Sequence, residues 1–163
     1  MNLREWLLTA AAAALYAALT LFLAPLSYGP VQARLSECMV LLAYYNKKWI
    51  PGLTAGCFLA NLASPFGAAD ILCGTAATFL AVSAMRFAPN LIAASLAPVL
   101  ANGVIIGLEL AYLAAIPGDT ASVLAVMAWI GAGECLSVTV LGTAVFRFLM
   151  RNEVIRRYIR EMK

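Results

Sequence analysis

Long apolar segments are the feature that most constrains the fold of this chain. Roughly 20 apolar residues cross the hydrocarbon core of a bilayer, and the run from Trp6 to Leu26 reaches that length without a charged residue. More such segments follow, so that 64% of the 163 residues are hydrophobic and only 12% are charged. The sequence therefore predicts an all-α integral membrane protein, with residues 1–163 forming a single membrane domain.

Charges, prolines and glycines divide the chain into six predicted transmembrane helices. The second and third are short for a full crossing, so we expect them to be tilted, interrupted or sheltered by the others. The first could instead be a secretory signal, but its apolar run exceeds the ~7–15 residues of a signal core, and we interpret it as a retained helix. The predicted helices cover residues 5–25, 31–45, 49–64, 68–86, 91–115 and 121–149.

The placement of Lys and Arg predicts the orientation, because these residues concentrate on the cytoplasmic side of membrane proteins. Arg4, Lys47, Lys48, Arg86 and the basic tail at 150–163 all fall at one alternating set of helix ends. Both the N- and the C-terminus are therefore predicted to be cytoplasmic, which agrees with an even number of spans, since that places both ends on the same side. We expect the tail to continue the sixth helix as an amphipathic extension that lies on anionic lipid or contacts a cytoplasmic partner subunit.

Several ionisable and amide side chains lie inside the predicted spans. A charged group in a bilayer costs several kcal/mol unless it is paired or faces a cavity, so each is a candidate functional residue. With the predicted orientation, five helices direct these groups toward one polar layer, in roughly the outer half of the membrane. The candidates are Arg34, Glu37, Asn61, Asp70, Asn102, Glu109 and Glu134, together with Gln32.

The charge balance of this layer is one cation against four carboxylates. Arg34 and Glu37 are three residues apart on one helical face and could neutralise each other, which would leave three carboxylates without a cationic partner in the spans. This excess predicts a positively charged ligand or a coupling cation such as a proton or sodium. The residues alone favour an organic and an inorganic cation almost equally.

Small residues form a second pattern. Two GxxxG steps, Gly52 to Gly56 and Gly103 to Gly107, predict close helix packing within the protein. In the first helix, Ala10, Ala14 and Ala18 recur every four residues. This alanine stripe is either an internal packing face or a docking face for another membrane subunit.

Catalytic and metal-binding signatures are missing. The chain has no His, and its four cysteines are isolated within apolar segments, where they are expected to be core residues. No phosphate-binding GxxxxGK[ST] loop and no GxSxG or HExxH motif occurs. We therefore predict no bound metal, no cofactor and no enzymatic activity, and expect a binding or transport subunit.

Five stretches of this chain resemble the QueT family, the substrate-binding (S) components of energy-coupling factor (ECF) transporters that import queuosine precursors. They run in order through the second to sixth predicted helices and cover most of the chain. They are YGPVQARLSE at 28–37, IPGLTAGCFLAN at 50–61, GAADILCGTAAT at 67–78, APVLANGVIIGLELAY at 97–112 and GAGE at 131–134.

The resemblance implies a six-helix S-component bundle in the plasma membrane of a prokaryote, with the substrate site open to the outside. The implied ligand is 7-aminomethyl-7-deazaguanine (preQ1) or a close relative, held by the polar residues named above. The implied partners are a membrane scaffold subunit, which would dock on the alanine stripe, and two cytoplasmic ATPase subunits, which would hydrolyse the ATP. Two alternatives stay open: an S component for another small heterocyclic vitamin, and a stand-alone cation-coupled transporter.

Overall fold

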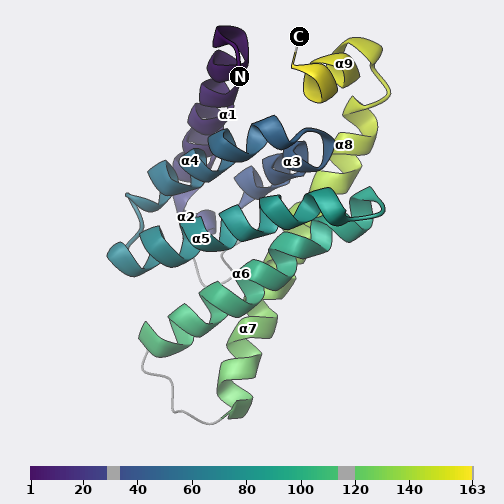
Figure 1. The fold of residues 1–163 in the computed structure, drawn as a ribbon. Helices are drawn as coiled ribbons and strands as arrows, with labels where there is room; N and C mark the ends of the chain where they lie inside the picture. Colours follow the sequence, from purple (N-terminus) through teal and green to yellow (C-terminus); the bar gives the residue numbers. More distant parts are fainter. Residues whose placement is uncertain (29–33, 114–119, 163) are drawn as a thin grey trace.

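The computed structural model describes residues 1–28, 34–113 and 120–162, and this part of the chain is helical with no β-strand (Figure 1). The predicted all-α fold is confirmed. The helices are α1 Leu3–Phe22, α2 Ala24–Ser27, η1 Leu35–Leu41, α3 Leu42–Tyr45, η2 Lys47–Trp49, α4 Ile50–Asn61, α5 Ala68–Ala84, η3 Met85–Phe87, α6 Leu91–Leu113, α7 Thr120–Glu134, η4 Cys135–Gly142, α8 Thr143–Leu149 and α9 Glu153–Glu161.

Four helical stretches of the described chain are long and apolar enough to cross a membrane. They correspond to the first, fourth, fifth and sixth predicted helices. The second is divided into a 3-10 segment of seven residues, η1, and a four-residue α-helix, α3. The third, α4, has 12 residues and is about 18 Å long, short of the ~30 Å hydrocarbon core. Six crossings therefore stay a prediction. The four long stretches are Leu3–Phe22, Ala68–Phe87, Leu91–Leu113 and Thr120–Leu149.

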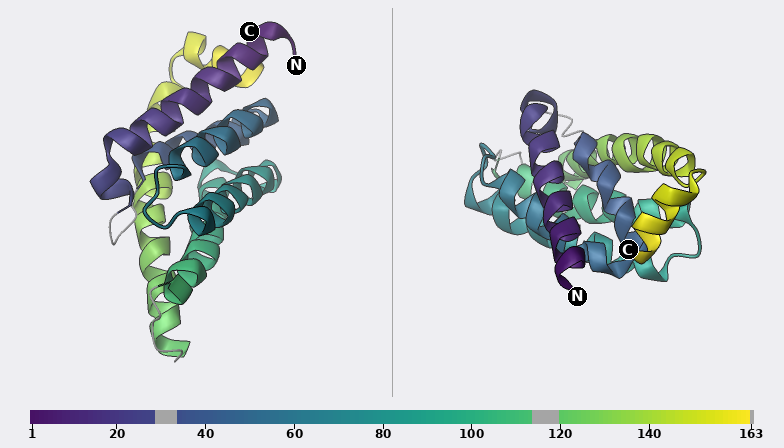
Figure 2. Two further views of the ribbon diagram at one scale, coloured as in Figure 1. Left: turned by 90° about the vertical axis from the view of Figure 1, so that its left-hand side faces the viewer. Right: turned by 90° about the horizontal axis from the view of Figure 1, so that it is seen from above.

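Three of the long helices and the shorter α4 form a stack, which the fourth long stretch crosses. Helices α1, α4, α5 and α6 pack in that order, each against the next, and α6 also packs against α7. The continuous α7–η4–α8 helix runs across this stack (Figure 2). Figures 1 and 2 show the two ends of the chain at the same end of the molecule. That this end faces the cytoplasm stays a prediction.

Both GxxxG steps lie at close contacts between helix backbones. A Cβ atom added at Gly56 would lie 2.8 Å from the Cβ of Tyr16 and 2.9 Å from the Ala13 carbonyl oxygen, both on α1. On α6, a Cβ added at Gly107 would lie 2.7 Å from the Cα of Met127 on α7. Only glycine fits at such distances, so the prediction of internal packing at the GxxxG steps is confirmed.

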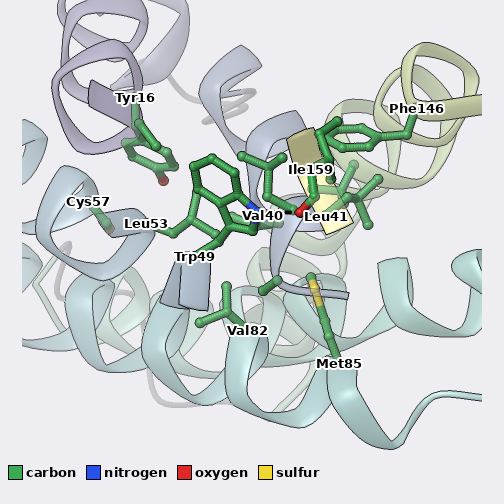
Figure 3. Close-up of a cluster of buried hydrophobic side chains, with 14 of the residues drawn as sticks. Tyr16, Val40, Leu41, Trp49, Leu53, Cys57, Val82, Met85, Phe146 and Ile159 are labelled. Atoms are coloured by element: carbon green, nitrogen blue, oxygen red, sulfur yellow. Dashed lines mark hydrogen bonds between the residues drawn. The ribbon is translucent and has the colours of Figure 1, made fainter. Parts of the chain in front are cut away.

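The main apolar core lies toward the end of the molecule that carries both termini. Figure 3 shows this cluster of buried side chains around Trp49, with contributions from α1, η1, α4, α5, η3, α8 and α9. The Trp49 Nε1–H donates a 2.9 Å hydrogen bond to the carbonyl oxygen of Ile159 on α9, and Ile159 and Met162 are buried. This end of the bundle is therefore closed by α9.

The expectation that the tail continues the sixth helix is wrong. Helix α8 ends at Leu149, and α9 is a separate helix that begins after Asn152. The Asn152 side chain accepts hydrogen bonds from the backbone N–H groups of Val154 and Ile155, at 2.9 and 3.2 Å. This N-cap favours a new helix start, and the turn before it folds the apolar face of α9 back onto the core.

We predict that Gly56→Ala destabilises the protein, because the new methyl group would force α1 away from α4. Overpacking of this kind costs about 1–3 kcal/mol, and thermal unfolding in detergent micelles would measure it. Gly131→Ala is the matched control, since a Cβ there meets nothing closer than 3.8 Å. Equal losses in melting temperature for the two variants would contradict the close α1–α4 contact.

Candidate functional site

An ion pair between Arg34 and Asp70 lies at the centre of the polar layer. Arg34 immediately precedes η1, and Asp70 lies in the first turn of α5. The Arg34 Nη2 atom is 3.3 Å from Asp70 Oδ2, and the two side chains are only 7% and 1% exposed. The sequence had left a local Arg34–Glu37 pair open, and the structure gives Arg34 a partner on a different helix instead.

Asn61, at the end of α4, contacts the backbone of Asp70, the acidic member of this pair. Its Nδ2 donates a 3.0 Å hydrogen bond to the backbone oxygen of Asp70. A Cβ atom at Gly74 would collide with the Asn61 amide nitrogen, so glycine at this position of α5 allows the contact. The amide thereby fixes the start of α5, and with it the carboxylate that holds Arg34.

Glu37, on η1, is held by Tyr16 of α1, a residue that sequence reasoning missed. The Tyr16 hydroxyl donates a hydrogen bond to Glu37 Oε1, and the Tyr16 side chain is fully buried. Thr20 and Ser36 make a second link between α1 and η1, with their hydroxyl oxygens 2.6 Å apart. An aromatic hydroxyl within an otherwise apolar helix is the signal that could have identified Tyr16.

A small cavity opens beside the ion pair, with room for about one water molecule. Two of its lining residues, Ile106 on α6 and Ile130 on α7, are apolar and almost fully buried. The others are polar: Arg34, Asn102 and Glu134. The structure thus brings three predicted site residues together around one space, and Glu109 follows on the same face of α6, seven residues after Asn102.

Many acceptor oxygens of this layer have no hydrogen-bond donor. A buried acceptor without a partner costs about 1–3 kcal/mol, so a cluster of them fits a ligand that supplies donors. The ion pairs found in the described part of the chain also leave Glu37, Glu109 and Glu134 without a cation. The unpartnered oxygens are Glu37 Oε2, Asn61 Oδ1, Asp70 Oδ1, Glu109 Oε1 and Oε2, and Glu134 Oε1.

The remaining predicted residues lie elsewhere or outside the described chain. Gln32 falls in 29–33, which the structure does not describe. Ala10, Ala14 and Ala18 are exposed on α1, and the first two line an apolar groove between α1 and α4.

Within 1–28, 34–113 and 120–162, no three His, Cys, Asp or Glu side chains are grouped as a metal site would require.

Comparison with known proteins decides the family. The family model described as "QueT transporter" matches residues 6–151. The chain belongs to the QueT transporter family. Among curated proteins, the "Queuosine precursor transporter QueT" of Lactococcus lactis subsp. cremoris (strain MG1363) is 40% identical over 79 residues. That alignment covers 46% of this chain and 46% of the relative. No solved structure matches this chain.

We predict that Arg34→Met destabilises the protein by about 3–5 kcal/mol, because it leaves the buried Asp70 carboxylate without its cation. Thermal unfolding in detergent would measure the loss. Arg156→Met is the matched control, because the Arg156–Glu153 pair is exposed and such pairs contribute about 0–1 kcal/mol. Equal melting temperatures for the two variants would show that the Arg34 pair does not stabilise the fold.

Proposed function

We propose that this chain is the substrate-binding component of an ECF-type importer that takes up a queuosine precursor, 7-aminomethyl-7-deazaguanine or a close relative. The observation that carries the proposal is the cluster of unpartnered acceptor oxygens near Arg34, beside a small cavity that Glu134 lines, together with three carboxylates that have no cation. Membership of the QueT family supports the substrate class, and the name of the lactococcal relative supports it further.

The ligand supplies the groups that this site lacks. The guanine edge presents N–H groups at N1 and N2, which a carboxylate can accept together, and the aminomethyl group adds a positive charge. The ring carbonyl is an acceptor that suits the Arg34 guanidinium. Ile106 and Ile130 would then contact the two faces of the flat ring, since ligand sites combine apolar walls with a few polar groups that fix orientation.

Binding requires the site to open further. A deazaguanine ring is much larger than the single water molecule for which the cavity has room. Ile106 and Ile130 come from different helices, so a small separation of α6 from α7 would widen the space between them. The released apolar contact would be replaced by contact with the ring.

The alanine stripe is the proposed docking face for the membrane scaffold subunit, and ATP hydrolysis would reside in two cytoplasmic partner subunits. The groove beside the stripe is apolar and shallow, lined mainly by small residues that allow a helix backbone to approach closely. Small side chains bury little apolar surface against lipid, so this face is better suited to contact with a helix of another subunit. Its lining residues are Trp6, Thr9, Ala10, Ala13, Ala14, Pro51, Gly52, Ala55 and Leu59.

We expect the purified protein to bind the aminomethyl deazaguanine tightly, and Glu109→Gln to weaken binding about tenfold or more because a buried charged acceptor is lost. Isothermal titration calorimetry in detergent would measure both. Glu153→Gln, on the exposed surface of α9, is the control and should bind as the parent does. Tight binding of an unrelated vitamin instead would overturn the substrate assignment and favour another S component.

A transport assay separates the proposal from a stand-alone cation-coupled transporter, which the unpaired carboxylates would also suit. Uptake into vesicles is expected to require the scaffold and ATPase subunits and ATP. Uptake by the chain alone that collapses with the proton or sodium gradient would overturn the ECF assignment.

Replacing Ala14 tests the docking face, because a larger side chain there would block close helix approach. Ala14→Leu is expected to abolish co-purification with the scaffold subunit while ligand binding is unchanged. Ala76→Leu is the matched control, since Ala76 is exposed on α5, away from the groove. Loss of co-purification in both variants would contradict a specific docking face on α1.

A further inference from the structure

The buried carboxylates Glu37 and Glu109 differ in how many of their oxygens accept a hydrogen bond. Glu37 has one oxygen held by the Tyr16 hydroxyl and one without a partner, whereas no N–H or O–H group donates to either oxygen of Glu109, near which lies the weakly donating Cys73 thiol. A guanine edge offers two parallel N–H groups and needs both oxygens of one carboxylate, as paired donors do in bidentate contacts. An ammonium group is a point charge and can be bound by a single oxygen. Glu109 is therefore suited to the guanine edge of the ligand, and Glu37 is suited to its ammonium group.

We propose that Tyr16 is a positioning residue that reserves Glu37 for the cationic amine of the ligand, while Glu109 accepts from the guanine edge. This assignment rests on the proposed function and names the contacts within its site. Tyr16 does not contact the ligand. It acts through Glu37, by occupying Oε1 and leaving Oε2 as the one oxygen available to the ammonium.

The surrounding packing fixes this geometry. Gly56 lets α4 approach the Cβ of Tyr16 closely, which fixes the position of α1 at the residue that carries the phenol. The Thr20 hydroxyl donates to the Tyr16 carbonyl oxygen at 2.9 Å and lies against Ser36, the residue before Glu37. Two adjacent turns of α1 therefore hold two adjacent residues of η1, and the Glu37 carboxylate cannot rotate freely.

The spacing along α6 fits a ligand that spans both carboxylates. Asn102 lines the cavity and Glu109 follows seven residues later, which is about 10 Å along a helix. Ile106 lies between them on the same face and also lines the cavity. A ring against Ile106 with its guanine edge toward Glu109 would place the opposite substituent at the end of the cavity lined by Asn102 and Glu134, and Glu134 is close enough to Glu37 for the two carboxylates to interact electrostatically.

The assignment also connects the site with the opposite face of α1. Tyr16 is on the buried side of the helix, and the alanine stripe is on the exposed side. A partner that shifts α1 would move the Tyr16 hydroxyl, and with it the oxygen of Glu37 that binds the amine. Ligand affinity and partner docking would thus be coupled through one hydrogen bond.

The test compares two probes, 7-aminomethyl-7-deazaguanine and 7-deazaguanine, which has the same ring without the amine. Tyr16→Phe is expected to weaken binding of the aminomethyl compound about tenfold, the loss typical of one hydrogen bond to a charged group, and to leave 7-deazaguanine nearly unchanged. Glu37→Gln should show the same selectivity with a larger loss. Glu109→Gln should weaken binding of both probes equally.

Because Tyr16 acts through Glu37, the double variant Tyr16→Phe/Glu37→Gln is expected to bind the aminomethyl compound no more weakly than Glu37→Gln alone. Tyr45→Phe is the control, since Tyr45 stacks on Phe146 in the apolar core. A loss in Tyr16→Phe that is equal for both probes, or that adds to the Glu37→Gln loss, would overturn the positioning role. A parent protein that binds neither probe would instead overturn the proposed function.

Discussion

The buried guanidinium of Arg34 is the charge on which the polar layer depends. It lies among four carboxylates, and its ion pair with Asp70 joins the segment before η1 to the start of α5. Burial of a charge pair is tolerated only when the geometry is good and other polar groups complete it. The Ser27 carbonyl oxygen, 3.4 Å from Arg34 Nε, and the Asn61 amide, bonded to the Asp70 backbone, supply that completion.

One cation cannot neutralise four carboxylates, and the remainder of the site follows from this imbalance. Glu37, Glu109 and Glu134 stay without a cation in the described chain, each with at least one buried oxygen that has no donor. The desolvation of these carboxylates lowers the free energy of unfolding until a cationic or donor-rich ligand binds. The ligand that we propose would stabilise such a site, because a ligand that binds only the folded state adds to stability.

Close backbone packing gives the two faces of α1 different roles. Gly52 and Gly56 on α4 draw α1 inward at Thr9, Ala13 and Tyr16, so that one side of α1 reaches the site. The exposed side keeps small residues and an apolar groove. The same contact that positions Tyr16 against Glu37 therefore also forms the wall of the surface on which we propose the scaffold subunit docks.

The amino-acid sequence by itself determined the helical class, four of the six transmembrane helices that it predicted, and the set of buried ionisable residues with its excess of negative charge, because hydrophobicity and burial cost are local properties. It also predicted both GxxxG contacts. Only the tertiary structure decided that Arg34 pairs with Asp70 rather than Glu37, that Tyr16 holds Glu37, and that α9 folds back from its Asn152 cap. These depend on which helices approach one another, and contacts between residues 21 or 36 positions apart leave no periodic trace in the sequence.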